Sequence, residues 1–201
     1  MQKFDAEQTA AASDAVKRAT AHHEAGRMTL TLASKHFELS DPAAYLRAVP
    51  GKSAQSGNRL SDPKNSHLDR REKDLERVMI ALGGLVAEEL FADISYRGEG
   101  AAIVLHADST RHDIEYVQEE LGRLQAKGDI QEIMGKARAR LREHIRIWQA
   151  IAAYLLAADG RDSVSKAEIE SIESVRAIRT ARSPSGVGVL ARLLAFFRRA
   201  G

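Results

Sequence analysis

The sequence predicts a mainly α-helical domain with a small two-stranded β-ribbon. Apolar residues recur every three or four positions over long stretches, which is the period of an amphipathic helix. Aromatic residues make up only 5% of the chain and alanine is abundant, a composition typical of helices and not of a β-sandwich. The ribbon is expected in residues 48–60 or 94–105. A length of 201 residues suits one domain, or one domain with a tail.

The first expected element is an alanine-rich helix over residues 5–23. Residues 30–37 fit either a continuation of this helix or a loop. Residues 40–66 contain three prolines, two glycines and many polar side chains, so they predict a loop with a short hairpin near residues 45–49.

A second helix is expected from Leu68 to Leu90, where apolar residues fall at spacings of three, four and seven. Gly83 and Gly84 interrupt this pattern. Glycine destabilises a helix interior by about 1 kcal/mol, so the pair predicts either a close packing contact or a break. Residues 94–105 are punctuated by glycine and partly β-like.

Three further helices are expected in the second half of the chain. Ser109 is expected to cap a helix that ends near Gly128. The longest helix is expected over residues 130–158, which carry one long apolar stripe. Residues 165–168 read Ser-Lys-Ala-Glu, which is a capping box and predicts that a helix begins there.

The chain ends in a basic segment, so two parts are expected: a helical domain over residues 1–174 and a tail over residues 175–201. The tail contains six arginines and no acidic residue, whereas the whole chain carries a net charge of +2. One apolar face near its end is formed by Leu190, Leu193, Leu194 and Phe197. Such a segment is typical of a helix that binds a membrane surface or a partner. A helix docked on the core or a frayed terminus is the favoured interpretation, because about eleven residues are few for stable membrane binding.

Composition excludes several classes of site. The chain has no cysteine, which excludes disulfides, cysteine-ligated zinc, iron–sulfur clusters and thiol catalysis.

No apolar run approaches the roughly 18 residues of a membrane span, and the first residues lack the apolar core of a signal peptide. A cytoplasmic protein is expected, membrane-peripheral if the tail binds lipid. A nucleic-acid partner is not expected, because no binding motif or interleaved aromatic residues accompany the arginines.

The residues that indicate chemistry lie near the end of the first helix. His23 and Glu24 match the first two positions of H-E-x-x-H, in which two histidines on one helical face bind zinc and the glutamate polarises the attacking water. The position of the second histidine is Arg27. Arginine is effectively always protonated and has no lone pair, so it would repel Zn²⁺.

Several segments resemble the FtsH-type zinc peptidase domain, the protease half of the membrane-bound AAA proteases. Residues 23–26, His-Glu-Ala-Gly, resemble the family's H-E-A-G-H. Residues 81–90 resemble its L-G-G-R-A-A-E-E-L helix, and residues 109–114 resemble its segment that ends in N-D-L. Residues 141–172 resemble its closing helices. Because separate segments agree in order and spacing over roughly residues 20–172, the resemblance implies the fold of this peptidase domain.

The resemblance also implies a role for each matching residue. His23 would be the first zinc ligand, Glu24 the general base and Asp113 the third zinc ligand. Glu88 or Glu89 would orient a ligand histidine. The second histidine ligand is lost, so zinc is a doubtful cofactor.

Three interpretations of Arg27 stay open. In the first, the site binds no zinc, and the guanidinium pairs with Asp113 or Glu24 in the place of the metal. In the second, another histidine supplies the missing ligand. The candidates are His22, His106 and His112. In the third, a weakened metal site persists with extra waters. The first is favoured because a catalytic zinc normally has three protein ligands and only two remain.

The remaining polar and aromatic residues are expected to be structural. Trp148 lies on an apolar stripe and is expected in the core. The histidines without an evident partner are expected at the surface. They are His36, His67 and His144.

The expected function is that of a stand-alone, degenerate relative of the peptidase that binds a peptide or protein partner, or acts as a scaffold. Neither the ATPase module nor the membrane anchor of the resembled family is expected in this chain. The alternative is an active zinc metalloendopeptidase with a substitute ligand, working with a separate ATPase. A homo-oligomer is a further expectation.

Overall fold

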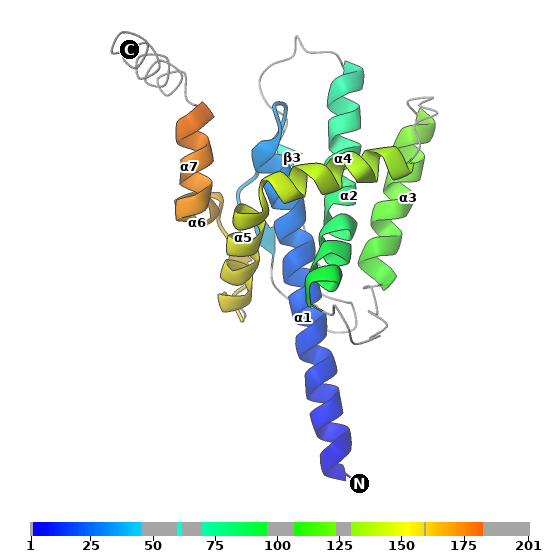
Figure 1. The fold of residues 1–201 in the computed structure, drawn as a ribbon, viewed down its shortest axis with the longest axis vertical. Helices are drawn as coiled ribbons and strands as arrows, with labels where there is room; N and C mark the ends of the chain where they lie inside the picture. The colour runs from blue at the N-terminus through cyan, green and yellow to red at the C-terminus, as the bar shows by residue number, and fades with distance from the viewer. Residues whose placement is uncertain are drawn as a thin grey trace, which may run out of the picture.

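The computed structural model describes residues 2–45, 60–61, 70–95, 107–123, 130–158 and 160–182. These residues form seven helices and four two-residue strands (Figure 1). The helices are α1 Gln2–Ala33, α2 Arg70–Ser95, α3 Ala107–Arg123, α4 Ile130–Glu143, α5 Ile145–Ala157, α6 Lys166–Ser171 and α7 Glu173–Arg182. The strands are β1 Glu38–Leu39, β2 Ala44–Tyr45, β3 Leu60–Ser61 and β4 Ser163–Val164. The prediction of a mainly helical chain is therefore confirmed.

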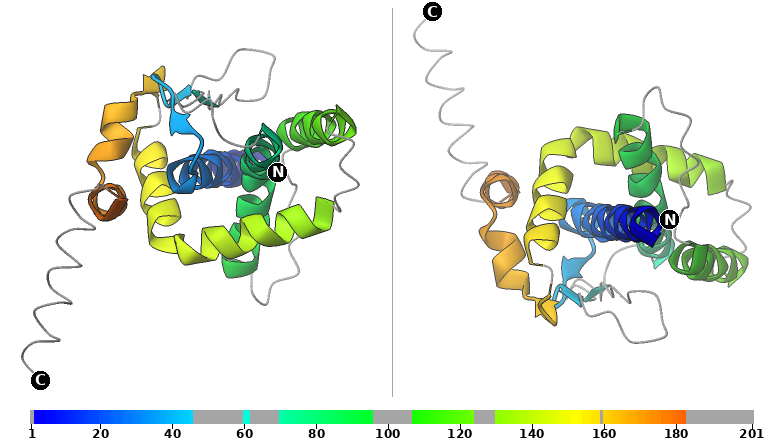
Figure 2. Two further views of the ribbon diagram at one scale, coloured as in Figure 1. Left: turned by 90° about the horizontal axis from the view of Figure 1, so that it is seen from above. Right: turned by 90° about the horizontal axis from the view of Figure 1, so that it is seen from below.

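Helix α1 is the centre of the arrangement. It packs against α2 on one side and against α5 on another, while α4 packs mainly on α2 (Figure 2). Helix α3 packs mainly on α2. The N-terminal half of α1 extends beyond the other helices (Figure 1). Residues near the middle and C-terminal end of α1 therefore face side chains from several helices.

Glycines allow α1 and α2 to approach closely. A Cβ atom on Gly26 would lie 2.6 Å from the carbonyl oxygen of Gly83, and it would also overlap Ala87. A Cβ atom on Gly83 would lie 2.5 Å from Cδ1 of Leu30. Helix α2 continues through both of its glycines. Of the two outcomes predicted for this glycine pair, the close packing contact is the one observed.

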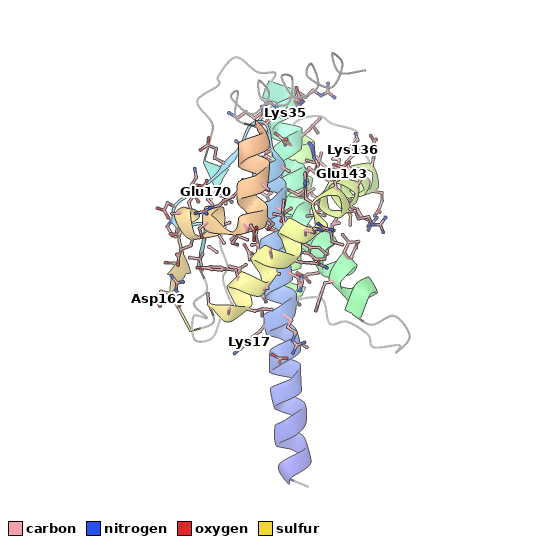
Figure 3. All side chains as sticks on the ribbon, turned by 60° about the vertical axis from the view of Figure 1, so that its left-hand side comes forward. Lys17, Lys35, Lys136, Glu143, Asp162 and Glu170 are labelled. Carbon is pink, nitrogen blue, oxygen red and sulfur yellow. The ribbon has the colours of Figure 1, made fainter. Side chains whose placement is uncertain are left out.

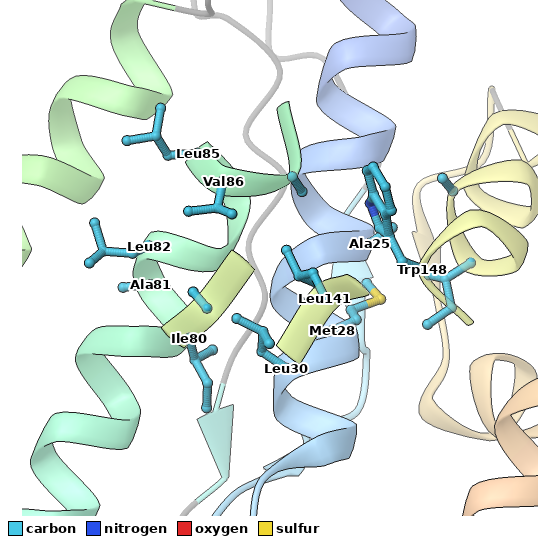
Figure 4. Close-up of a cluster of buried hydrophobic side chains, with 14 of the residues drawn as sticks. Ala25, Met28, Leu30, Ile80, Ala81, Leu82, Leu85, Val86, Leu141 and Trp148 are labelled. Carbon is cyan, nitrogen blue, oxygen red and sulfur yellow. The ribbon is translucent and has the colours of Figure 1, made fainter. Parts of the chain in front are cut away.

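The hydrophobic core lies where α1, α2, α4 and α5 meet (Figure 4). Trp148 of α5 is 1% exposed and packs in this core, as its place on the apolar stripe predicts. Other side chains of the core, labelled in Figure 4, are Ala25, Met28, Leu30, Ile80, Leu82, Val86 and Leu141. By contrast, the charged side chains labelled in Figure 3, such as Lys136 and Glu143, lie on the outside of the helices.

The small sheets differ from the single predicted ribbon. Strand β1 pairs antiparallel with β3, and β2 pairs antiparallel with β4, so the described residues contain two separate two-stranded sheets. Tyr45 does not belong to a local hairpin, because its partner in the sheet is Ser163. Residues 48–59 and 96–105 lie outside the described residues, and residues 94–95 are the end of α2.

Two predicted helices have different limits in the structure. Residues 130–158 do not form one helix, because the helix is interrupted at His144 between α4 and α5. The longest helix of the described residues is α1. The break has a physical reason: α4 packs mainly on α2 and α5 on α1, so the two segments follow different directions. Helix α3 begins at Ala107, so Ser109 lies inside its first turn and is not the cap.

The C-terminal elements begin as the sequence predicts. The side chain of Ser165 accepts a hydrogen bond from the backbone of Glu168, and Glu168 bonds back to the backbone of Ser165, which completes the capping box of α6. The expected domain boundary at residues 174 and 175 lies within α7, and Val175 is buried. The amphipathic segment of the tail lies outside the described residues. In the described part of the chain, no helix is long and apolar enough to span a membrane.

Candidate functional site

Three helices bring the predicted site residues together around His23. Its Nδ1 lies 2.5 Å from Oε1 of Glu88, which comes from α2. Its Nε2 lies 3.1 Å from Oδ2 of Asp113, which comes from α3. Glu24 is the next residue of α1, and its Oε1 is 3.9 Å from the same nitrogen. The imidazole is thus held between carboxylates at both of its nitrogens.

Gly84 makes room for this imidazole. A Cβ atom on Gly84 would lie 2.6 Å from Cδ2 of His23 and would overlap the ring nitrogen Nε2 as well. Because α1 and α2 run close together at their glycines, the ring of His23 lies directly against the backbone of α2. The two glycines that interrupt the apolar pattern therefore serve both the helix contact and the site.

The site is buried and strongly charged. His23, Glu24 and Glu88 are each 2% exposed or less. Burial alone lowers the pKa of His23, but hydrogen bonds with Asp113 and Glu88 and the charges of Glu24 and Glu88 outweigh this effect and raise the pKa to about 9. The described geometry therefore favours a protonated, positively charged imidazole between these carboxylates.

Arg27 lies beside Asp113 at the edge of this group. Its NH1 is 3.7 Å from Oδ1 of Asp113, and the guanidinium side chain is only 18% exposed. Asp113 thus faces two groups at once, His23 through one carboxylate oxygen and Arg27 through the other. Two cationic groups share this carboxylate, in the arrangement that the first interpretation of Arg27 predicts.

Glu88 and Glu89 point to different neighbours. Glu88 contacts His23, whereas Glu89 bonds to Arg138 of α4 at 2.5 Å. Both partners of the second pair are about one-third exposed. Of the two residues that the resemblance offers for orienting the histidine, Glu88 is the one in position to do so.

Of the three histidines offered as a substitute ligand, only His22 has a described side chain, and its ring packs among aromatic side chains. The ring of His22 stacks on Phe91 at 4.0 Å between centroids and meets the edge of Trp148 at 5.1 Å. His106 and the side chain of His112 lie outside the described part of the structure. His36 is 2% exposed, so its expected place at the surface is wrong. The reason is local: Ser34 accepts hydrogen bonds from the backbone amides of His36 and Phe37, which turns the chain inward after α1.

The partly buried ring of His22 leads us to expect an acid-dependent loss of stability. Burial lowers the pKa of His22 from 6.5 to about 4. The unfolded chain therefore binds a proton below about pH 6.5 while the folded chain does not, so the free energy of unfolding decreases as the pH falls from 6.5 to 4. We expect this residue to account for about 2 kcal/mol of the decrease, after allowance for partial exposure. Urea unfolding at several pH values, carried out on the wild type and on His22→Phe, measures this contribution. If the free energy of unfolding depended on pH in the same way in both proteins, the prediction would be contradicted.

The described residues around His23 lack the second histidine of the H-E-x-x-H motif. A catalytic zinc ion takes three protein ligands and an open position, whereas of the three residues that match the ligand positions of the motif only His23 and Asp113 are of ligand type, and they lie 3.1 Å apart. The cation of Arg27 stands beside the same carboxylate. Among the residues that the structure describes, no three histidine or carboxylate side chains stand as a preformed metal-binding group. No protein-family model matches the chain, and no curated protein matches it.

Proposed function

We propose that this chain is a peptidase-like binding domain in which the guanidinium of Arg27 takes the place of the zinc ion. The observation that carries the proposal is the pairing of Asp113 with both His23 and Arg27, at 3.1 and 3.7 Å. In a zinc peptidase of the resembled type, the aspartate and the histidine would bind the metal. Here a positive side chain compensates the same partly buried carboxylate.

The charges around His23 support this proposal. Three carboxylates gather around His23, and an unpaired carboxylate of this kind is costly to bury. The protonated imidazole and the guanidinium together supply two positive charges. Arg27 thus serves the electrostatic role that a metal would serve, without providing a Lewis acid or an activated water.

The chemistry that remains is recognition rather than hydrolysis. Glu24 matches the general base of the motif, but without a metal-bound water it has no nucleophile to activate. We propose that the domain binds an extended peptide or protein segment and does not cleave it.

A binding and cleavage assay with fluorescent unfolded casein tests this function. We expect the wild type to raise the anisotropy of the casein without releasing fragments, with or without added Zn²⁺. The matched control is Glu24→Gln, which removes the catalytic base but keeps the side-chain shape, and its binding is expected to equal that of the wild type. Cleavage by the wild type that Glu24→Gln abolishes would show an active peptidase, and no binding would contradict the recognition role.

A further inference from the structure

Helix α3 supplies Asp113 to the group around His23, although α3 packs mainly on α2 (Figure 2). His23 itself belongs to α1. The distance between the two side chains therefore depends on what holds α3 in place against α2. Apolar packing supplies part of that hold, because Val117 and Leu121 of α3 are buried in the core. Such packing is non-directional, so polar contacts are needed to fix the position of α3 along α2.

Two polar contacts join α2 to α3. The guanidinium of Arg77 donates a hydrogen bond to the hydroxyl oxygen of Tyr116, near the middle of α3. At the end of α3, NH2 of Arg123 lies 3.3 Å from Oδ2 of Asp74. The side chain of Asp74 is only 8% exposed, and its other oxygen lies 3.8 Å from NH1 of Arg77. One buried carboxylate thus connects both contacts.

Arg77 is the central residue of these contacts. Its guanidinium also lies over the ring of Phe37, which follows α1, with 5.4 Å between Cζ and the ring centroid. Phe37 is buried, and a cation is attracted to the face of an aromatic ring. The planar guanidinium has five donors, so it can serve several neighbours at once. Arg77 therefore ties α3 to α2 and to the chain that leaves α1.

Tyr116 stands one turn after Asp113 on α3. Residues three apart in a helix lie on the same face. The side of α3 that meets Arg77 is therefore also the side that presents Asp113 to His23. Because a single helical turn joins the two residues, the position of Tyr116 determines where the carboxylate of Asp113 lies.

We propose that Arg77 is a positioning residue that, through Tyr116, holds Asp113 against His23. The assignment goes beyond the proposed function, because it concerns how the site is assembled and holds whatever the site binds. Losing the contact is expected to move Asp113 away from His23. Glu88 is expected to stay in place, because it lies on α2 and meets His23 without the help of α3.

NMR of the imidazole N–H groups of His23, in protein made with ¹⁵N-labelled histidine, tests the proposal. The Nε2 signal reports the carboxylate of Asp113, 3.1 Å away, and the Nδ1 signal reports Glu88 at 2.5 Å. Asp113→Ala gives the position of the Nε2 signal without its partner. We expect Arg77→Gln to move the Nε2 signal toward that position and to leave the Nδ1 signal unchanged. Tyr116→Phe, which removes only the hydroxyl, is expected to cause a smaller movement in the same direction.

The matched controls come from a similar group of side chains that includes no residue of α3. The hydroxyl of Tyr154 donates to Glu168 at 3.1 Å, and NH1 of Arg161 lies 2.7 Å from the same carboxylate. Tyr154→Phe and Arg161→Gln therefore make the same chemical changes at another place. Both are expected to keep the two signals of His23 where they are in the wild type.

Three results would overturn the assignment. The first is an Nε2 signal that Arg77→Gln leaves unchanged, and the second is an equal movement in Arg161→Gln. If Arg77→Gln does not fold, Tyr116→Phe decides, and an unchanged Nε2 signal in that variant is the third. A wild-type Nε2 signal that Asp113→Ala does not alter would overturn the assignment together with the pairing on which the proposed function rests.

Discussion

Replacing Gly26 by alanine is expected to destabilise the protein by about 3 kcal/mol. The added methyl group would lie 2.6 Å from the carbonyl oxygen of Gly83 and would overlap Ala87. Neither group can turn aside, because one is backbone and the other is a Cβ atom of a packed helix. Helices α1 and α2 must therefore separate, and overpacking of this kind costs about 1–3 kcal/mol, with rigid neighbours at the upper end. Urea unfolding followed by circular dichroism measures the loss.

The matched control is Gly135→Ala on α4. This glycine is also helical, but an added methyl group there meets nothing within 4 Å. Alanine favours a helix over glycine by about 1 kcal/mol, so the control is expected to be slightly more stable than the wild type. A loss of stability in Gly26→Ala together with a gain in Gly135→Ala would support the close contact of α1 and α2. Equal stabilisation of both would mean that the helices do not approach at Gly26.

Removing Glu88 is expected to be still more damaging. The Glu88→Ala variant deletes the carboxylate that lies 2.5 Å from His23 and leaves a buried, charged imidazole with one partner fewer. Breaking a buried ion pair by removing one partner costs about 3–5 kcal/mol. We therefore expect Glu88→Ala to lose that much free energy of unfolding at pH 7.

The neighbouring residue provides the comparison. Glu89 pairs with Arg138, but both side chains are about one-third exposed. We therefore expect Glu89→Ala to lower the free energy of unfolding by about 1 kcal/mol. The two variants remove the same chemical group from adjacent positions of one helix, and urea unfolding under identical conditions compares them. A similar loss in both would mean that the contact between Glu88 and His23 contributes little to folding.

Local patterns in the sequence predict the elements whose structure depends on near neighbours. The capping box at Ser165 is satisfied entirely within four residues, and it is present as predicted. Trp148 is buried because its position on an apolar stripe already determines which face it occupies. The pair Gly83 and Gly84 predicts either a helix break or a close packing contact, and only the packing partner in α1 decides between the two.

Features that depend on distant contacts could not be predicted in the same way. The pairing of Tyr45 with Ser163 joins segments far apart in the sequence, and two-residue strands are too short to show an alternating pattern. The break at His144 has no glycine or proline to mark it, and it follows from the different packing partners of α4 and α5.

The candidate site was only partly predictable for the same reason. Matching motifs suggest that His23 and Asp113 lie together, and the structure places them 3.1 Å apart. No motif distinguishes Glu88 from Glu89, since only the orientation of α2 decides which one faces α1. The burial of His36 depends on the turn formed by Ser34, although a serine after a helix is a signal that could have indicated that turn.

Zinc content at the His23 site tests the central claim most directly. The zinc content per chain is determined by elemental analysis after loading with zinc and dialysis. It is measured for the wild type and for Arg27→His, and in each case the content of the same protein carrying Asp113→Ala is subtracted. Using this difference excludes zinc bound elsewhere in the chain. The replacement of zinc by Arg27 predicts a difference of zero for the wild type and of about one zinc ion for Arg27→His, because the new histidine restores the missing second histidine ligand. A full zinc ion in the wild type that Asp113→Ala removes would contradict it.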